Sequence, residues 1–292
     1  MASLPQWVEG ARPRTLPAAV APVLVGSAAA LRVDAADLVR ALLALLVSLA
    51  LQVGVNYAND YSDGIRGTDE VRSGPVRLVG QRLADPRHVK WAALGSFGAA
   101  GGFGLLLVVL SQAWLMLPLG ALAVLAAWRY TGGDNPYGYR GLGEVYVFVF
   151  FGLVATLGTE YTQAGSVSWF GVAGAVGVGA TASAILVANN LRDIPTDTEH
   201  GKRTLAVRLG DERTRQLYTE LLGGSVAALA VMAFWEPWVL LSVLALPMAS
   251  RALRVVRAGT SGPGLVPVLA ATGLYEVASA VLVLVGVAVG SG

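Results

Sequence analysis

The sequence predicts an all-α polytopic membrane protein with nine transmembrane helices, its N-terminus inside and its C-terminus outside. Hydrophobic residues make up 55% of the 292 residues, and the mean hydropathy is +0.61. Charged residues make up only 14%, against about 25% in ordinary soluble domains. The charges are clustered, and apolar runs of about 18 or more residues are read as transmembrane helices.

Nine apolar segments follow one another along the chain. They cover residues 15–31, 39–59, 91–110, 113–128, 142–161, 168–190, 216–234, 238–250 and 264–289. No small-residue cleavage pattern follows the first segment, so we expect it to be retained as a helix. The fourth and eighth segments are short for a span and leave little room for tilt. Glycines are spread through these segments, where small residues let helices approach closely.

The distribution of Lys and Arg supports both the number of spans and their orientation. With a cytoplasmic N-terminus, 19 of the 21 Lys and Arg residues fall on the cytoplasmic side, and only Arg32 and Arg40 fall outside. This is the pattern of the positive-inside rule, and one span more or fewer would scramble it. The two long hydrophilic loops, 60–90 and 191–215, therefore share the cytoplasmic face.

The composition also excludes several kinds of site. Cysteine is absent, so the chain has no disulfide, iron–sulfur cluster or thiolate nucleophile. The two histidines, His88 and His200, fall in different polar loops, which does not match the ligand spacing of a structural zinc site.

Two polar stretches repeat each other at the ends of the second and sixth segments. They read NYANDYSDGIRGTDE (residues 56–70) and NNLRDIPTDTEHGKRT (residues 189–204). In each, an Asn precedes an Asp by four residues, a second Asp follows, and the chain then turns basic after a glycine. The residues are Asn56, Asp60 and Asp63 in the first stretch and Asn189, Asp193 and Asp197 in the second. This pattern indicates a degenerate internal repeat.

Each set of three side chains can project from one helix face, because residues three or four apart lie together. Clustered carboxylates suit Mg²⁺, which binds through one or two carboxylates plus substrate phosphates. Cationic side chains nearby would engage the remaining phosphate oxygens; these are Arg66, Arg72, Arg77, Lys202 and Arg203. Arg outnumbers Lys 19 to 2, so a lysine within the second stretch is informative.

A third polar loop, WRYTGGDNPYGYRGLGE (residues 128–144), is predicted on the same face. Two interpretations stay open: an interfacial aromatic belt, or a substrate wall in which tyrosines stack on an aromatic acceptor or a carbocation. The residues for the second interpretation are Tyr130, Tyr137, Tyr139 and Arg140. Acids within membrane segments are functional candidates, and here they are Glu144, Glu160 and Glu276.

The paired Asn/Asp loops resemble those of the UbiA-type intramembrane prenyltransferase superfamily. Three stretches are most similar to its branch that prenylates 1,4-dihydroxy-2-naphthoate in menaquinone synthesis: RPRTLPAAVAPVLVG, YTGGDNPYGYRGLGE and DIPTDTEHGKRTLAVRLG. The resemblance covers the whole chain, 1–292, as a single domain. It implies nine helices around a central cavity open to lipid, a polyprenyl diphosphate donor, Mg²⁺, and a location in the cell (inner) membrane with cytoplasmic active-site loops.

The resemblance also implies residue roles. Asn56, Asp60 and Asp63 would hold one side of a Mg²⁺–diphosphate, and Asn189, Asp193 and Asp197 the other. Arg66, Lys202 and Arg203 would contact phosphates, and Tyr137, Tyr139 and Arg140 the acceptor. The superfamily often spaces the first two aspartates by four residues, whereas Asp60 and Asp63 are three apart. Whether Asp63, Asp69 or both complete the first site therefore stays open.

The implied reaction is departure of a charge-neutralised diphosphate, attack of the naphthalene ring on the allylic cation, and loss of CO₂ to give demethylmenaquinone. Other aromatic acceptors, such as 4-hydroxybenzoate, remain alternatives. A CDP-alcohol phosphotransferase fits less well, because Gly67-Thr68 replaces the Ala-Arg of that signature. A cation-coupled transporter would place its acids near the midplane rather than at one face. We expect no nucleic-acid partner, and the sequence leaves the prenyl chain length and the oligomeric state open.

Overall fold

The computed structural model describes residues 2–67 and 76–291, and every regular element within them is helical. Asp69 and Arg72, two of the sequence-predicted residues, lie outside these ranges. The first half of the chain contains α1 (Leu4–Gly10), the 3-10 turn η1 (Pro13–Thr15), α2 (Pro17–Leu31), α3 (Leu38–Ile65), α4 (Pro86–Ser111) and α5 (Met116–Arg129).

The second half begins with the 3-10 turn η2 (Tyr137–Arg140). A continuous rod follows, made of α6 (Gly143–Val147), the π-helical segment η3 (Phe148–Val154) and α7 (Ala155–Ala164). The remaining elements are α8 (Trp169–Glu199), α9 (Leu205–Met232), the 3-10 segment η4 (Pro237–Ala245), α10 (Leu246–Arg257), η5 (Gly262–Leu265) and α11 (Val266–Gly290). Each of the nine apolar segments overlaps one of these helical rods, which confirms the all-α class.

Six helical segments in the described ranges are long and apolar enough to cross a membrane. They cover residues 38–65, 86–111, 143–164, 169–199, 237–257 and 262–290. A seventh is added if residues 4–15 and 17–31, which meet at a bend of 48°, count as one span. The apolar helix α5 is shorter, and α9 carries several charges in its first half. Nine crossings and their orientation therefore stay predictions.

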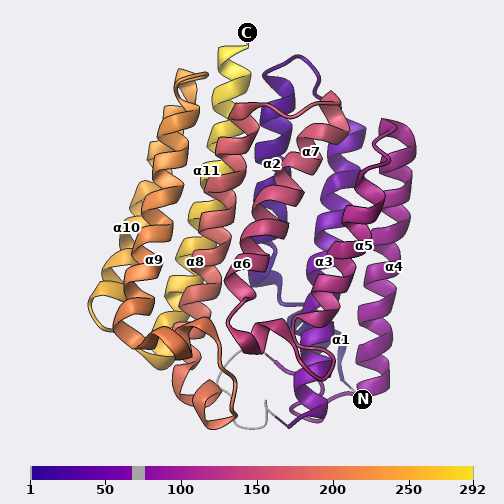
Figure 1. The fold of residues 1–292 in the computed structure, drawn as a ribbon, viewed down its shortest axis with the longest axis vertical. Coiled ribbons are helices and arrows are strands. Elements are labelled where there is room, and N and C mark those ends of the chain that lie inside the picture. Colours follow the sequence, from indigo (N-terminus) through magenta and orange to yellow (C-terminus); the bar gives the residue numbers. More distant parts are fainter. Residues whose placement is uncertain (1, 68–75, 292) are drawn as a thin grey trace.

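The helices run side by side along the long axis of the molecule (Figure 1). The N-terminus and the ends of α3, α5 and α8 from which the polar loops leave lie at one end of the bundle, and the C-terminus lies at the other (Figure 1). The asparagine and the two aspartates of each stretch lie in the C-terminal turns of α3 and α8. The bundle therefore brings both stretches, and the loop after α5, to the same end.

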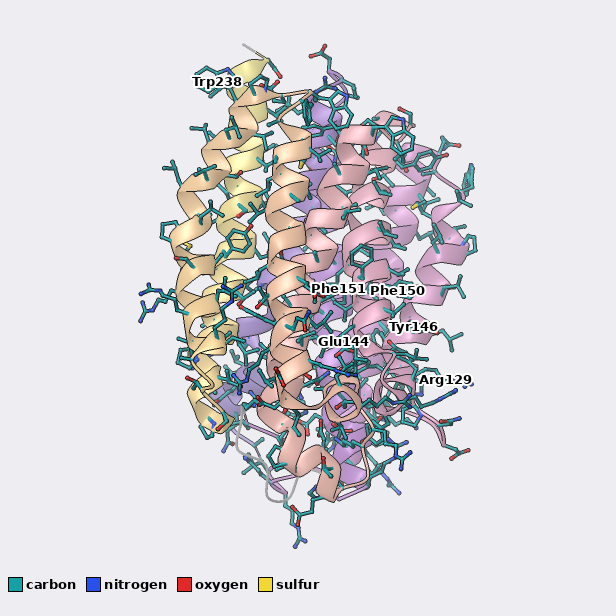
Figure 2. All side chains as sticks on the ribbon, turned by 60° about the vertical axis from the view of Figure 1, so that its left-hand side comes forward. Arg129, Glu144, Tyr146, Phe150, Phe151 and Trp238 are labelled. Carbon is teal, nitrogen blue, oxygen red and sulfur yellow. The ribbon has the colours of Figure 1, made fainter. Side chains whose placement is uncertain are left out.

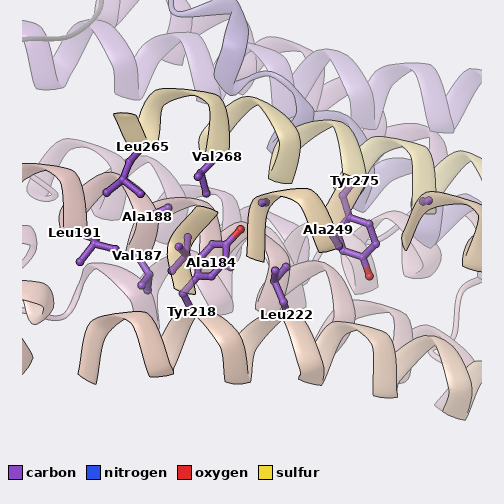
Figure 3. Close-up of a cluster of buried hydrophobic side chains, with 13 residues drawn as sticks. Ala184, Val187, Ala188, Leu191, Tyr218, Leu222, Ala249, Leu265, Val268 and Tyr275 are labelled. Atoms are coloured by element: carbon purple, nitrogen blue, oxygen red, sulfur yellow. The ribbon is translucent and has the colours of Figure 1, made fainter. Parts of the chain in front are cut away.

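Packing in the second half is built on small and aliphatic side chains of α8 to α11. Ala184, Val187 and Leu191 of α8 contact Tyr218 and Leu222 of α9 and residues of α10 and α11 in one buried cluster (Figure 3). Two buried hydroxyl pairs cross this region: Tyr218 with Thr272, with oxygens 2.6 Å apart, and Ser225 with Tyr275, at 3.1 Å. Each phenol thus has a polar partner in an otherwise apolar interior.

Glu160, one of the three intramembrane acids, has a structural position at the turn between α7 and α8. Its Oε1 accepts a hydrogen bond from the backbone N–H of Ser168, 2.9 Å away, and Ser168 is the N-cap of α8. Carboxylates are stabilised at helix N-termini by unpaired N–H groups and the helix dipole. The contacts of Glu160 therefore fix the start of α8, at the end of the bundle opposite the polar loops.

Candidate active site

The ends of α3 and α8 meet, joined by a tyrosine of the third loop. Lys202 Nζ, just beyond α8, lies 3.5 Å from Asp63 Oδ2 near the end of α3. Tyr139 donates a hydrogen bond of 2.7 Å from its hydroxyl to Asp63 Oδ1, and Lys202 Nζ lies 4.7 Å from the centroid of the Tyr139 ring. All three polar loops therefore meet at Asp63.

This junction forms the polar mouth of a cavity of about 960 Å³. Aliphatic residues of α3, α4 and α5, including Val47, Leu105 and Leu117, line the deeper part together with the α6–η3–α7 rod. Leu106 of α4 and Leu122 of α5 do not line the cavity, and each is about half exposed. The wall that α4 and α5 form is therefore one helix thick and apolar on its outer face.

The four aspartates divide into two pairs. Asp63 and Asp197 line the cavity. Asp60 is fully buried and accepts hydrogen bonds from the backbone N–H groups of Leu78, at 2.7 Å, and Val79, at 3.2 Å. Asp193 forms a bidentate ion pair with Arg192, and both N–O distances are 2.8 Å. One aspartate of each stretch thus faces the cavity, and the other binds a neighbouring part of the protein.

The two predicted asparagines are also engaged. Asn56 donates from Nδ2 to the Ala11 carbonyl and to Thr15 Oγ1, both at 2.9 Å, and so attaches the segment between α1 and α2 to α3. Asn189 accepts a hydrogen bond of 2.9 Å from Arg192. Both asparagines line the cavity.

Three of the predicted arginines lie further out, whereas a fourth, Arg77, lines the cavity. Arg66 is exposed and donates to the carbonyls of Thr131 and Gly133, which ties the third loop to α3. Arg203 and Arg140 are exposed, and neither lines the cavity. Arg203 contributes its backbone N–H, which donates to the Tyr139 carbonyl at 3.1 Å. These contacts hold the loops against each other at the mouth.

Cationic side chains outnumber carboxylates among the described residues that line the cavity. Five are cationic and three acidic: Arg12, Arg14, Arg77, Arg192 and Lys202, and Glu9, Asp63 and Asp197. Sequence reasoning had assigned no site role to Arg12 and Arg14. Their signal was the RPRT stretch directly before the first apolar segment. An excess of cations over carboxylates beside amide groups suits a multiply charged anion such as a diphosphate.

A row of aromatic rings leads from the mouth into the cavity. Tyr130 and Tyr137 meet edge to face with ring centroids 5.5 Å apart, Tyr137 stacks on Tyr146 at 3.8 Å, and Tyr146 is followed by Phe150 at 6.1 Å. All four line the cavity. Figure 2 shows Tyr146 and Phe150 at increasing distance from the loop end. Burial, and secondarily Tyr146, raise the pKa of Tyr137, so its phenol stays neutral.

The donor set at the mouth fits Mg²⁺ held jointly with a phosphate ligand. Within residues 2–67 and 76–291, no group of three or more His, Cys, Asp or Glu side chains could hold a metal by itself. Mg²⁺ does not need such a group, because one or two carboxylates, water and substrate phosphates complete its octahedron. Asp63 and Asp197, beside carboxamides and cations, provide that type of partial site.

Comparison with known proteins gives consistent matches along the chain. Residues 19–264 match the UbiA prenyltransferase family. The chain is 56% identical over 283 residues to a 1,4-dihydroxy-2-naphthoate octaprenyltransferase of Mycobacterium leprae, covering 97% of this chain and 96% of the relative. It is 57% identical over 274 residues to the Mycobacterium tuberculosis enzyme of the same name, covering 94% of each.

A solved structure shows the same fold. The UbiA homolog from Archaeoglobus fulgidus bound to GPP and Mg²⁺ superposes with a TM-score of 0.71 at 14% identity, over 97% of this chain and 99% of the other.

Proposed function

Because the chain belongs to the UbiA prenyltransferase family, we propose that it transfers a polyprenyl group from polyprenyl diphosphate to 1,4-dihydroxy-2-naphthoate. Diphosphate and CO₂ leave, and the product is a demethylmenaquinol, the reduced form of demethylmenaquinone. Identity of 56% over 97% of the chain to a named dihydroxynaphthoate octaprenyltransferase supports this acceptor. The structural observation that carries the proposal is the contact of Lys202 with Asp63 at the mouth of an apolar cavity.

The same proposal covers the placement in the membrane. The chain is a single domain, 1–292, that crosses the cell (inner) membrane nine times, with the polar loops on the cytoplasmic side. The opposite positions of the two termini in Figure 1 agree with an odd number of crossings, and the clustering of Lys and Arg agrees with the orientation. Within that frame the cavity mouth lies at the inner leaflet.

Groups in or near both Asn/Asp stretches hold the diphosphate. Lys202, Arg77 and the RPRT arginines contact its oxygens as charge-assisted donors. Asp63 and Asp197 would hold Mg²⁺ at the mouth, and the ion would supply Lewis-acid neutralisation of the leaving group. Asp60 holds the end of α3 through the backbone at Leu78 and Val79, and Asp193 orients its neighbour Arg192 at the end of α8. Asp69 stays a proposed additional ligand.

Loss of diphosphate leaves an allylic cation, which the aromatic row stabilises. Aromatic faces attract cations, and Tyr137, Tyr146 and Phe150 present such faces along the cavity. The apolar wall of α4 and α5 holds the isoprenoid tail and limits the access of water to the cation. The naphthoate ring then attacks the cation from the same cavity, so the chain needs no nucleophile of its own.

The test is a product assay with the purified protein. It is incubated with Mg²⁺, octaprenyl diphosphate and one aromatic acid at a time: dihydroxynaphthoate, 4-hydroxybenzoate or homogentisate. We expect mass spectrometry to find a prenylated, decarboxylated naphthoquinol only with dihydroxynaphthoate, and none after chelation of Mg²⁺. Product from 4-hydroxybenzoate at an equal rate would contradict the acceptor assignment.

A second assay tests whether this is a catalyst or a transporter. The protein is reconstituted in liposomes, and cation uptake and prenyl transfer are followed in the same preparation. Prenyl transfer without uptake is the expected result. Uptake without product would overturn the proposed function altogether.

A further inference from the structure

One buried pair beside the cavity has no role in the chemistry above. Asn190 of α8 lines the cavity, one residue after Asn189. Its Nδ2 donates a hydrogen bond of 2.9 Å to Oε1 of Glu144, the second residue of α6. Both side chains are more than nine-tenths buried. Glu144 precedes Tyr146 of the aromatic row by two residues on α6, and Figure 2 labels both side chains.

The hydrogen bond fixes which way the Asn190 carboxamide faces. Nδ2 carries the amide protons and donates one of them to Glu144 Oε1, so the NH₂ end of the carboxamide faces Glu144. The amide oxygen, Oδ1, is then turned away from Glu144 and is left to accept a hydrogen bond from another group. The backbone of Glu144 is held as well, because Ser183 Oγ donates to its carbonyl at 3.2 Å. Glu144 thus acts on the cavity through Asn190.

The position of Asn190 separates it from the diphosphate groups. Asp197 and Lys202 follow it toward the mouth, whereas Tyr146 and Phe150 line the cavity beyond the mouth. A group between the cations and the aromatic row meets the aromatic acceptor rather than the leaving group. A carboxamide oxygen there selects a ligand that carries a proton donor.

We propose that Asn190 recognises a ring hydroxyl of the aromatic acceptor through Oδ1, and that Glu144 is the positioning residue that orients this carboxamide. The inference rests on the proposed function, because it assumes an aromatic acceptor in this cavity. A site built around a hydrogen-bond acceptor rejects ligands that lack the donor, because its own polar group is then left unpaired. Asn190 of α8 therefore discriminates between acceptors by their ring hydroxyls, and Glu144 of α6 holds Asn190 in the orientation that this needs.

The test compares dihydroxynaphthoate with 1-hydroxy-2-naphthoate and 4-hydroxy-2-naphthoate as competitive inhibitors of prenyl transfer. In the unsubstituted protein, we expect the analogue that lacks the recognised hydroxyl to bind at least about tenfold more weakly than the other, as loss of one hydrogen bond predicts. Asn190→Leu should abolish this difference while the KM for octaprenyl diphosphate stays within about twofold. A difference that survives in Asn190→Leu would overturn the proposal.

Three further variants separate positioning from simple structural support. Glu144→Met should lose the preference as Asn190→Leu does, and should add nothing in the double variant. Glu144→Gln should keep it, because the glutamine oxygen can still accept from Asn190. Loss of the preference in Glu144→Gln would contradict the positioning role. Ser183→Ala is the matched control: it disturbs the same α6–α8 contact, and the preference should be unchanged.

Each failure has a separate signature. If the unsubstituted protein makes no prenylated product, the proposed function is wrong. If it makes product but both analogues inhibit equally, only the inference about Asn190 and Glu144 is wrong. A variant that does not fold is recognised by its thermal unfolding in detergent; Asn190→Ala, which removes the carboxamide without adding bulk, then replaces Asn190→Leu. It should likewise abolish the difference between the two analogues, and a difference that survives would overturn the proposal.

Discussion

Asp60 and Asp63 lie one helical turn apart on α3, yet their carboxylates have different partners. Asp63 meets Lys202 and Tyr139 at the cavity mouth, whereas Asp60 accepts from two backbone N–H groups of the chain that returns toward α4. Substitutions at the two positions should therefore have different effects. Substitution of Asp63 removes a negative charge from the cavity, whereas substitution of Asp60 removes the hydrogen bonds that hold α3 to the backbone at Leu78 and Val79.

We predict that Asp63→Asn lowers kcat/KM at least about a hundredfold, as expected when a group that stabilises leaving-group charge is lost. The protein should still fold, because asparagine keeps the size and can accept from Tyr139. The measurement is the initial rate as a function of Mg²⁺ concentration. The Mg²⁺ concentration that gives half of the maximal rate should be higher in the variant. Asp211→Asn is the matched control, since Asp211 pairs with Arg215 on the exposed side of α9. Equal activity in the two variants would refute the metal assignment of Asp63.

The Arg192–Asp193 pair leads to a prediction on stability. Both side chains are buried, with 6% and 4% of their surfaces exposed, and removing one partner of such a pair leaves an uncompensated charge. Asp193→Ala should lower the free energy of unfolding by about 3–5 kcal/mol, measured as thermal unfolding in detergent. The double variant Arg192→Met with Asp193→Leu should recover much of that loss. If Asp193→Ala unfolds at the same temperature as the unsubstituted protein, the pair has no structural role.

At the scale of whole helices, the α6–η3–α7 rod packs on the backbone of α8 at Gly152. A Cβ placed on Gly152, in the π-helical segment, would lie 2.5 Å from Gly179 Cα and 2.8 Å from the Ala175 carbonyl. Those are backbone atoms, which cannot move aside as a flexible side chain would. The glycine pair therefore sets how closely the aromatic row approaches α8 and Asn190.

We expect Gly152→Ala to separate these helices and to lower the unfolding temperature, because overpacking costs about 1–3 kcal/mol or more when the backbone must shift. Activity should fall together with stability. Gly223→Ala on α9 is the control, because nothing lies within 4 Å of the added carbon; there the variant should be as stable as the original or slightly more so. An unfolding temperature for Gly152→Ala equal to that of Gly223→Ala would show that the contact is not tight.

The helices could be predicted from apolar runs, but their ends could not. α9 begins at Leu205, well before the apolar segment at 216, and α8 continues to Glu199, past the end of its segment at 190. Hydropathy detects only the apolar part of a helix and misses polar turns at its ends. Asp63 and Asp197 therefore lie on the last turns of α3 and α8 rather than in loops.

The spacing gave Asp60 and Asp63 the same predicted role and could not show that they have different partners. Both aspartates can project from the end of α3, and which one meets the cavity depends on where residues 76–79 return to the bundle. That return is a tertiary contact with no local signal. Lys202 is different: its rarity in an arginine-rich chain marked it, and the structure places it on Asp63.

On the scale of the whole molecule, one end of the cavity is polar and the rest is apolar. The cations, carboxylates and amides lie at the end where the three loops meet, and the deeper walls come from α3, α4, α5 and α7. A diphosphate at the mouth therefore directs its attached chain along these walls. The outer face of α4 and α5 is apolar as well, so a long chain can continue between helices toward lipid.

This geometry predicts that the deeper walls determine which prenyl chain lengths the protein accepts. A substitution at Gly104 of α4 tests this. Gly104 lines the cavity, and an added Cβ there would meet only Val47, at 3.7 Å. Gly104→Phe should therefore fit its first carbon and fill the tail path with its ring. We expect kcat/KM for octaprenyl diphosphate to fall at least about tenfold, roughly the effect of blocking one or two buried methylene contacts, while geranyl diphosphate is used as before.

Gly102→Phe, on the same helix but outside the cavity lining, should discriminate against neither donor. An equal loss with both donors in Gly104→Phe would mean that the tail leaves the cavity by another route.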